Sequence, residues 1–240
     1  VRALGFDMDH TLALYKKRPI EELAFTETVR KLMSKSGYPA ALSRIAYDPE
    51  GCVRGLIVDK ERGNTLKLDK YNYVAVAYHG TQPMTSGEIR RQYGEDVVRF
   101  DPNKHHSVDT LFSVPEVYLY CKLVDLIDRK IVADKSYGQA FIDVRACIDE
   151  AHRDESIKRK VRERPDKFID EDPNLALTLH KFRVSGKKLF LLTNSDLTYV
   201  GLLLGFLLNG KLPQYATWKD YFDVVIVEAG KPGFYKRTEP

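Results

Sequence analysis

Short apolar segments that end in polar loops lie near both ends of this 240-residue chain, and they constrain its fold more than any other feature. Residues 3–6, 188–192 and 221–227 are apolar along most of their length, so each predicts a strand buried on both faces. Residues 175–184 and 197–208 predict helices between the later strands. Buried strands separated by helices are typical of a parallel sheet that is covered on both sides. The chain is therefore predicted to be an α/β protein.

The middle of the chain has a different pattern. Residues 20–37 carry a partial apolar stripe at helical spacing. A period of two then predicts antiparallel strands in three segments, at residues 56–59, 65–68 and 73–77. Helical segments follow at about 113–131, 137–153 and 156–169. This order predicts a split α/β core, residues 1–30 and 174–240, that carries a large inserted α+β region at residues 31–173.

Composition excludes several classes of protein. Hydrophobic residues make up 43% and charged residues 30% of the chain, which excludes a collagen-like or mostly disordered protein. The net charge of +4 is too small to require a nucleic-acid partner, but it is compatible with a small anionic substrate. The longest apolar run, residues 202–208, is too short for a membrane span. No basic-then-apolar leader follows Val1, and the absence of an initiating Met is compatible with a trimmed start.

The three cysteines, Cys52, Cys121 and Cys147, are far apart and form no CxxC pair. A sparse, odd set of thiols fits a reducing compartment and argues against a disulfide framework or a zinc site. We therefore expect a cytoplasmic protein with neither a nucleic-acid nor a membrane partner.

Two carboxylates, Asp7 and Asp9, follow the first predicted strand. Ligands of open parallel sheets bind outside the carboxyl ends of the strands, where both side chains can converge. Converging carboxylates need a cation or a shared proton, and Mg²⁺ is the natural complement. Asp7 could then attack phosphorus as a nucleophile, while Asp9 protonates the leaving oxygen and later activates water. A structural role, in which Asp7 and Asp9 only cap the following helix, fits the sequence equally well.

Two further polar loops follow predicted strands. Thr193 and Asn194 offer a hydroxyl, an amide and backbone N–H groups at a helix start, which suits an anion. Lys231 can neutralise both a nucleophile and a transferring phosphoryl group. The structural alternatives are a helix N-cap at Thr193 or Ser195 and a solvated lysine at position 231. The occurrence of all three loops in one chain, each after a predicted strand, is far less expected by chance than any one of them alone.

With these residues identified, the chain resembles the haloacid dehalogenase superfamily, whose first three motifs are similar to Asp7-Met8-Asp9-His10-Thr11-Leu12, Leu192-Thr193-Asn194-Ser195 and Lys231-Pro232. Further segments resemble the IMP/GMP-preferring cytosolic purine 5′-nucleotidases: Gly5-Phe6-Asp7-Met8-Asp9-His10-Thr11-Leu12-Ala13, Arg54-Gly55-Leu56, Gly63-Asn64, Leu66-Lys67, Tyr78-His79-Gly80, Asp109-Thr110-Leu111-Phe112 and Asp143-Val144-Arg145. The resemblance covers nearly the whole chain in the same order.

This resemblance implies a Rossmann-like core with a parallel sheet and an inserted cap that supplies the nucleoside site. By likeness, Asp7 is the nucleophile, Asp9 is the general acid/base, and Lys231 stabilises the phosphate. The same likeness assigns the phosphate to Thr193, Asn194 and Ser195. Mg²⁺ is implied as the cofactor, bound by Asp7 and by the backbone carbonyl of Asp9.

In the cap, the resemblance implies that Phe112 stacks on the purine and that four residues hold base, ribose or phosphate: Arg145, Asp149, His152 and Lys158. Spacing alone places Arg145, Asp149 and His152 on one helical face. Without the resemblance, an exposed stripe of ion pairs is the favoured interpretation of that face. Ser113 stands where family members often have Asn, which leaves the preferred base open.

The sequence therefore predicts Mg²⁺-dependent hydrolysis of a purine nucleoside monophosphate, IMP or GMP, through a phospho-aspartate. The alternatives are phosphotransfer to a nucleoside through the same intermediate and a catalytically silent nucleotide-binding scaffold. The family's fourth motif, an acidic cluster that completes the Mg²⁺ shell, has no counterpart after Lys231. We therefore expect either a fragment or a protein without a normal metal site. The resemblance also implies a homo-oligomer.

Overall fold

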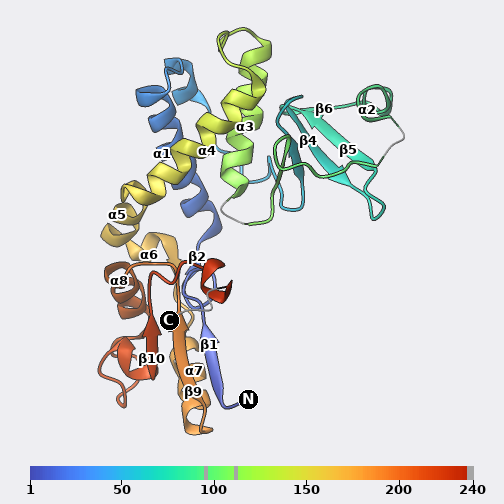
Figure 1. Cartoon of the computed structure of the whole chain (residues 1–240). Helices are drawn as coiled ribbons and strands as arrows, with labels where there is room; N and C mark the ends of the chain where they lie inside the picture. Colours follow the sequence, from blue (N-terminus) through green and yellow to red (C-terminus); the bar gives the residue numbers. More distant parts are fainter. Residues whose placement is uncertain (95–96, 111–112, 237–240) are drawn as a thin grey trace. The chain divides into compact units, whose positions relative to one another are not determined.

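The computed structural model describes residues 1–94, 97–110 and 113–236 (Figure 1). The chain divides into two compact units: unit 1 contains Val1–Ile20 and Lys158–Pro240, and unit 2 contains Glu21–Ile157. These bounds differ from the predicted division at residues 30 and 174, whose assignment to a catalytic core and a cap stays a prediction. In the described part of the chain, no helix has the length and apolar character needed to cross a membrane.

Unit 1 contains the parallel sheet that the sequence predicts. Its strands are β1 (Ala3–Phe6), β9 (Lys188–Leu192) and β10 (Val224–Ile226), and β9 lies between the other two. Both pairings are parallel, with Phe6 opposite Leu191 and Ile226 opposite Leu192. Since parallel strands run in one direction, the loops that follow all three strands leave the sheet at the same edge.

Helices pack against this sheet in unit 1, but its two outer strands are not buried on both faces as predicted: exposed and half-buried residues alternate along β1, and Val224 of β10 is exposed. Helix α7 (Leu175–Val184) contacts β1 through the rings of Phe182 and Phe6, whose centroids are 6.2 Å apart. Asp196 caps α8 (Leu197–Leu208) by accepting a hydrogen bond from the backbone N–H of Tyr199. The remaining regular elements described in unit 1 are β2 (Leu14–Tyr15), α6 (Pro165–Phe168), β8 (Ile169–Asp170) and the 3₁₀ turns Trp218–Tyr221 and Gly233–Lys236. Helix α5 (Ser156–Glu163) begins in unit 2 and continues in unit 1.

Two elements differ from their prediction for local reasons. The expected helix at 156–169 is divided into α5 and α6, because Pro165 starts a new helix and Arg164 before it is not helical. The expected strand at 221–227 shortens to Val224–Ile226. Thr217 and Asp220 form a capping box there, so Tyr221 ends a 3₁₀ turn instead of starting the strand.

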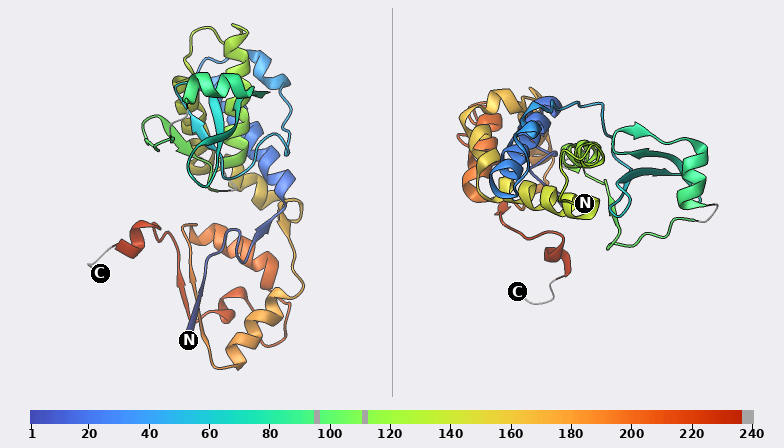
Figure 2. Two further views of the ribbon diagram at one scale, coloured as in Figure 1. Left: turned by 90° about the vertical axis from the view of Figure 1, so that its right-hand side faces the viewer. Right: turned by 90° about the horizontal axis from the view of Figure 1, so that it is seen from above.

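Unit 2 combines an antiparallel sheet with long helices. The sheet order is β6-β5-β4-β3-β7, and the strands are β3 (Ile57–Asp59), β4 (Asn64–Leu68), β5 (Val74–His79), β6 (Gln82–Pro83) and β7 (His105–Ser107). The helices are α1 (Lys17–Lys35), which begins in unit 1, α2 (Ser86–Tyr93), α3 (Ser113–Asp128) and α4 (Tyr137–Arg153), with a 3₁₀ turn at Ala40–Arg44. Figure 2 shows α2 beside the β5–β6 end of this sheet. The observed architecture is thus mixed α/β, with a small parallel sheet and antiparallel sheets.

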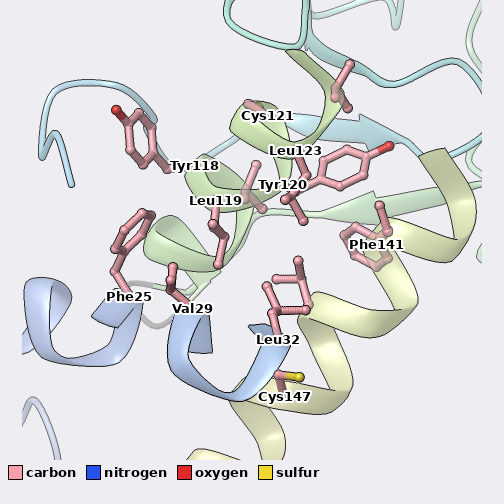
Figure 3. Close-up of a cluster of buried hydrophobic side chains, with 14 of the residues drawn as sticks. Phe25, Val29, Leu32, Tyr118, Leu119, Tyr120, Cys121, Leu123, Phe141 and Cys147 are labelled. Atoms are coloured by element: carbon pink, nitrogen blue, oxygen red, sulfur yellow. The ribbon is translucent and has the colours of Figure 1, made fainter. Parts of the chain in front are cut away.

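The hydrophobic core of unit 2 forms where α1, α3 and α4 meet the sheet (Figure 3). Helix α1 contributes Leu32, which is fully buried, and α3 contributes Leu119 and Tyr120, which are also fully buried. The ring of Tyr120 packs edge-on against Phe141 of α4 at a centroid distance of 5.4 Å. Close packing of large side chains makes such a core sensitive to the loss of even a few methyl groups.

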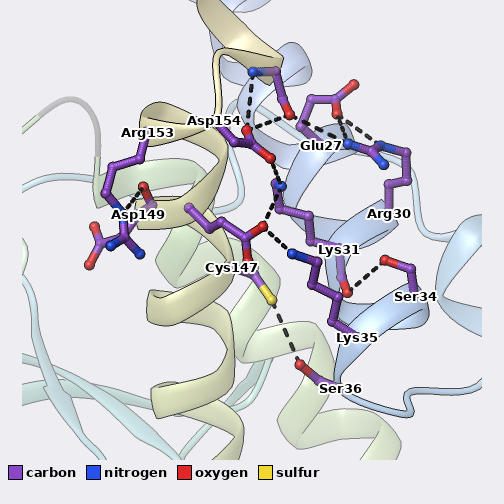
Figure 4. Close-up of polar contacts among 12 residues, drawn as sticks. Glu27, Arg30, Lys31, Ser34, Lys35, Ser36, Cys147, Asp149, Arg153 and Asp154 are labelled. Atoms are coloured by element: carbon purple, nitrogen blue, oxygen red, sulfur yellow. Dashed lines mark hydrogen bonds and ion pairs between the residues drawn. The ribbon is translucent and has the colours of Figure 1, made fainter.

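A polar seam joins α1 to α4 beside this core (Figure 4). The Lys31 side chain is only 3% exposed, and its Nζ donates to Glu150 Oε1 at 3.1 Å and to Asp154. Lys35 also donates to Glu150. These contacts hold the carboxyls of Glu150 and Asp154 below their usual pKa range, because each accepts hydrogen bonds from lysine side chains.

Core packing predicts a large cost for truncating Leu32. We expect Leu32→Ala to lower the free energy of unfolding by about 2–5 kcal/mol, since it removes buried methyl groups and leaves a cavity. Denaturant unfolding followed by circular dichroism measures this change. The matched control is Ile142→Ala on α4, whose side chain is 58% exposed. An equal loss in both variants would contradict the burial of Leu32.

The polar seam predicts a loss of stability in acid. A carboxyl whose pKa is lower in the folded state stabilises that state fully above its unfolded pKa, 4.5 for Glu150 and 3.8 for Asp154, and this contribution disappears as the pH falls through the folded value. We expect Lys31→Met to weaken the dependence of the free energy of unfolding on pH below about pH 5, because it removes the lysine that both carboxyls share, while Lys35 still donates to Glu150. Unfolding midpoints measured from about pH 7 to about pH 3 test this. Lys70→Met is the control, since its ammonium lies over the Tyr71 ring, and it should keep the wild-type slope.

Candidate active site

The predicted polar loops meet at one edge of the parallel sheet. Asp7 follows β1 directly, Thr193 follows β9 directly, and Lys231 lies in the loop after β10. Backbone hydrogen bonds join two of these loops, since Ala229 donates to the carbonyl of Thr193 at 3.0 Å and Glu228 to that of Ser195 at 3.1 Å. The structure therefore brings all three predicted motifs together within unit 1.

Asp7 forms an ion pair with Lys231. Asp7 Oδ2 lies 2.7 Å from Lys231 Nζ, and Oδ1 accepts the backbone N–H of Met8 at 2.8 Å. Lys231 Nζ also donates to the carbonyl of Leu192 at the end of β9, at 2.9 Å. The Asp7 side chain is 42% exposed and that of Lys231 15% exposed. Asp7 is thus an accessible side chain beside a cation that the backbone of β9 holds in place.

Asp9 has a different environment, made of hydroxyl groups. Tyr15 Oη donates to Asp9 Oδ1 at 2.7 Å, and Ser195 Oγ donates to Oδ2 at 2.8 Å. The hydroxyl of Tyr199 lies 2.9 Å from that of Tyr15. Burial, with a smaller contribution from the charge of Asp9, raises the pKa of Tyr15 well above its usual value. The Tyr15 phenol therefore stays protonated and acts as a hydrogen-bond donor to Asp9.

Asn194 connects the loop after β9 to the loop after β10. Its Oδ1 accepts the backbone N–H of Lys231 at 2.7 Å, and its Nδ2 donates to the Lys231 carbonyl at 3.0 Å. Thr193 is fully buried, and its hydroxyl accepts the backbone N–H of Ser195 at 3.2 Å. Of the three residues predicted to bind phosphate, Asn194 fixes Lys231, Ser195 contacts Asp9, and Thr193 shapes the loop.

The residues predicted to contact the nucleoside are distributed over both units. Lys158, on the unit 1 part of α5, donates to Asp196 Oδ2 at 2.7 Å, and its Nζ lies 5.3 Å from the centroid of the Tyr199 ring. Arg145, Asp149 and His152 all lie on α4 of unit 2. Phe112 lies outside the described residues, so its predicted stacking stays a prediction.

Glu116 on α3 orients the side chain of Arg145. Its carboxylate is 1% exposed and accepts a hydrogen bond from Arg145 Nη1 at 2.8 Å. Asp149, one turn along α4, lies 3.4 Å from Arg145 Nη2. Burial raises the pKa of Glu116 despite the opposing effect of the nearby guanidinium. The predicted helical face therefore contains ion pairs, and one of them reaches a buried acid.

Asp7 and Asp9 fit the chemistry of a Mg²⁺ site only in part. Mg²⁺ prefers oxygen ligands and near-octahedral geometry, and the Asp7 carboxylate and the Asp9 backbone carbonyl are ligands of that class. Within residues 1–94, 97–110 and 113–236, no group of three or more His, Cys, Asp or Glu side chains converges as a metal site would require. These two residues would therefore supply part of the ligand shell.

Sequence reasoning missed three residues of these networks: Tyr15, Tyr199 and Glu116. Tyr15 and Tyr199 are 184 positions apart, and no local pattern links them. The only sequence signal at Glu116 is its place near the start of a mostly apolar helical segment, where a lone carboxylate suggests a helix N-terminus.

Comparison with known proteins identifies the family of the chain. The profile of the 5′ nucleotidase family matches residues 1–240. A 5′-nucleotidase domain-containing protein of Dictyostelium discoideum is 30% identical over 246 aligned residues, which cover 100% of this chain and 41% of that relative. The chain thus spans less than half the length of this relative. Because the family profile covers the chain from end to end, the chain belongs to the 5′ nucleotidase family, a family of hydrolases.

Proposed function

We propose that this protein hydrolyses nucleoside 5′-monophosphates, with purine nucleotides such as IMP and GMP as substrates, through a phospho-aspartate on Asp7. One observation carries the proposal: an accessible Asp7 carboxylate is paired with Lys231 at 2.7 Å, at the edge of a parallel sheet where ligands bind. Membership of the 5′ nucleotidase family supports the nucleotide as substrate. A haloacid dehalogenase-type core is consistent with the sheet order and with the three loops.

The two aspartates divide the chemistry between them. Asp7 attacks phosphorus, the bond from phosphorus to the 5′-oxygen breaks, and Asp9 gives its proton to the leaving oxygen. Water then attacks the phospho-aspartate and gives a proton to Asp9, so that phosphate leaves and both carboxyl groups return to their starting forms. Lys231 offsets negative charge on Asp7 and on the phosphoryl group throughout.

Mg²⁺ is the proposed cofactor, as is typical of this class of nucleotidase. The Asp7 carboxylate and the Asp9 backbone carbonyl would hold it. When bound, it supplies positive charge that lowers the repulsion between Asp7 and an anionic substrate.

Unit 2 is the proposed source of nucleoside specificity. Arg145 is held by Glu116 at 2.8 Å and by Asp149 at 3.4 Å, so its guanidinium is positioned before any ligand binds. With Asp149 and His152 on the same helix, it presents donors and acceptors suited to a base or ribose. Lys158 in unit 1 is the proposed contact for phosphate or ribose.

We also propose a cytoplasmic location and a homo-oligomer. The three cysteines are free and buried, which suits a reducing compartment. The oligomer rests on the family resemblance, and light scattering on the purified protein measures it directly.

Phosphate release tests the proposed activity. We expect the full-length protein that contains this chain to release phosphate from IMP or GMP in the presence of Mg²⁺, and we expect EDTA to stop the release until Mg²⁺ is restored. A malachite-green assay measures the product. Nucleotide binding without phosphate release at any divalent metal would instead support a silent scaffold, and transfer of the phosphoryl group to added inosine would support a phosphotransferase.

The nucleophile is tested by Asp7→Asn. This change removes the attacking carboxylate and keeps its size, so we expect turnover to fall by at least about a thousandfold while nucleotide binding persists. Steady-state kinetics and equilibrium dialysis measure the two properties. Asp134→Asn is the matched control, since Asp134 is exposed in unit 2 and should leave turnover unchanged. Turnover by Asp7→Asn within about tenfold of wild type would exclude the covalent mechanism.

A further inference from the structure

The hydroxyl chain that ends at Asp9 has a defined direction. Tyr15 has one hydroxyl proton, and it donates that proton to Asp9 Oδ1 at 2.7 Å. In the 2.9 Å contact between the two phenols, Tyr199 must therefore be the donor and Tyr15 the acceptor. Protons thus point from Tyr199 to Tyr15 and from Tyr15 to Asp9 Oδ1.

Both oxygens of Asp9 are held by this arrangement. Ser195 donates to Oδ2 at 2.8 Å while Tyr15 donates to Oδ1, so the carboxylate cannot turn about its own axis without breaking both bonds. All these donors are neutral hydroxyls, in contrast to the Lys231 ammonium that contacts Asp7. Neutral donors can fix the orientation of a carboxyl group without holding it permanently as an ion.

Backbone contacts fix the position of Tyr15 itself. Tyr15 belongs to β2, which pairs antiparallel with β8 and places Tyr15 opposite Ile169. The next residue, Lys16, donates its backbone N–H to the carbonyl of Phe168 at 2.8 Å. Tyr199 is 4% exposed in the first turn of α8, where its own N–H is bound by the Asp196 cap at 2.8 Å. The two phenols are therefore anchored on separate elements of unit 1.

We infer that Tyr15 is a positioning residue for Asp9: its phenol, held by Tyr199, keeps the Asp9 carboxyl group in the orientation that delivers a proton to the leaving oxygen. This inference rests on the proposed hydrolase function. The Tyr15 hydroxyl touches neither the nucleophile nor the phosphoryl group in this role, and it acts only through Asp9.

The inference has a consequence that depends on the leaving group. A nucleoside leaves as a basic 5′-alkoxide and needs the proton, whereas p-nitrophenolate is stable as an anion and leaves without one. A loss of proton delivery therefore slows cleavage of IMP far more than cleavage of p-nitrophenyl phosphate. General damage to the site would slow both reactions alike.

Tyr15→Phe provides the test, because it keeps the ring and removes only the hydroxyl. In the full-length protein with Mg²⁺, we expect kcat/KM for IMP to fall by about 10- to 100-fold and that for p-nitrophenyl phosphate by less than about threefold. We expect Tyr199→Phe to shift the ratio in the same direction by a smaller factor, since Tyr15 keeps its own bond to Asp9. The KM for IMP should change little, because binding is not affected.

Tyr47→Phe is the matched control. Its hydroxyl donates to the Glu21 carboxylate at 3.0 Å in unit 2, so this variant also loses a phenol–carboxylate hydrogen bond but should keep the wild-type ratio of the two substrates. Equal losses on both substrates in Tyr15→Phe, or no loss on either, would overturn the inference. If the wild-type protein releases phosphate and Asp7→Asn abolishes the release, the proposed function stands whatever the Tyr15 result. A wild-type protein without phosphate release overturns both.

Discussion

Two parallel backbone pairings, β1 with β9 and β9 with β10, determine where the proposed chemistry is located. They direct three loops to one edge of the sheet, although Asp7 and Lys231 are separated by most of the chain. The backbone then fixes the cation, since Lys231 Nζ donates to the Leu192 carbonyl at 2.9 Å and Asn194 binds both backbone groups of Lys231. The ion pair with Asp7 therefore depends on strand register more than on side-chain packing.

The same sheet edge gives its two carboxyl groups different partners, and this difference supports the separate roles proposed for them. Asp7 has the Lys231 ammonium beside it, a cation that can offset the negative charge of the proposed nucleophile and of the phosphoryl group. The donors at Asp9 are hydroxyls from Tyr15 and Ser195, which orient the group without adding a full charge. Enzymes that use two acids in one site depend on such a contrast between environments. Here the contrast arises because Asp7 contacts Lys231 in the loop after β10, whereas Asp9 contacts Ser195 in the loop after β9.

The sequence was sufficient to predict the parallel sheet, because apolar segments of strand length were each followed by polar residues. Helices α7 and α8 and strand β9 were predicted with the bounds observed, and Gly186 marks the end of α7. The N-cap of α8 is Asp196, whereas the structural alternative in the sequence placed it at Thr193 or Ser195. Two errors arose where local side-chain chemistry outweighs the apolar pattern. Pro165 divides a helix, and the Thr217–Asp220 capping box replaces the start of a strand. Apolar periodicity does not detect either effect.

The contacts within the candidate site were harder to predict than the residues themselves. Asp9 and Ser195 were singled out by motif, but their 2.8 Å hydrogen bond depends on how β1 and β9 align. The Tyr15–Tyr199 contact needs both the β2–β8 pairing and the start of α8, which no local pattern specifies together.

Asn194 shows how such a contact changes the interpretation of a motif. A loop amide after a strand suggests a direct ligand for an anion, yet here its Oδ1 and Nδ2 both bind the backbone of Lys231. Since an amide nitrogen carries two hydrogens, one remains for a phosphate oxygen while the other holds the Lys231 carbonyl. A single side chain can therefore join the loop after β9 to the loop after β10, which carries Lys231. In the proposed function, phosphate binding and the position of Lys231 are therefore coupled through Asn194.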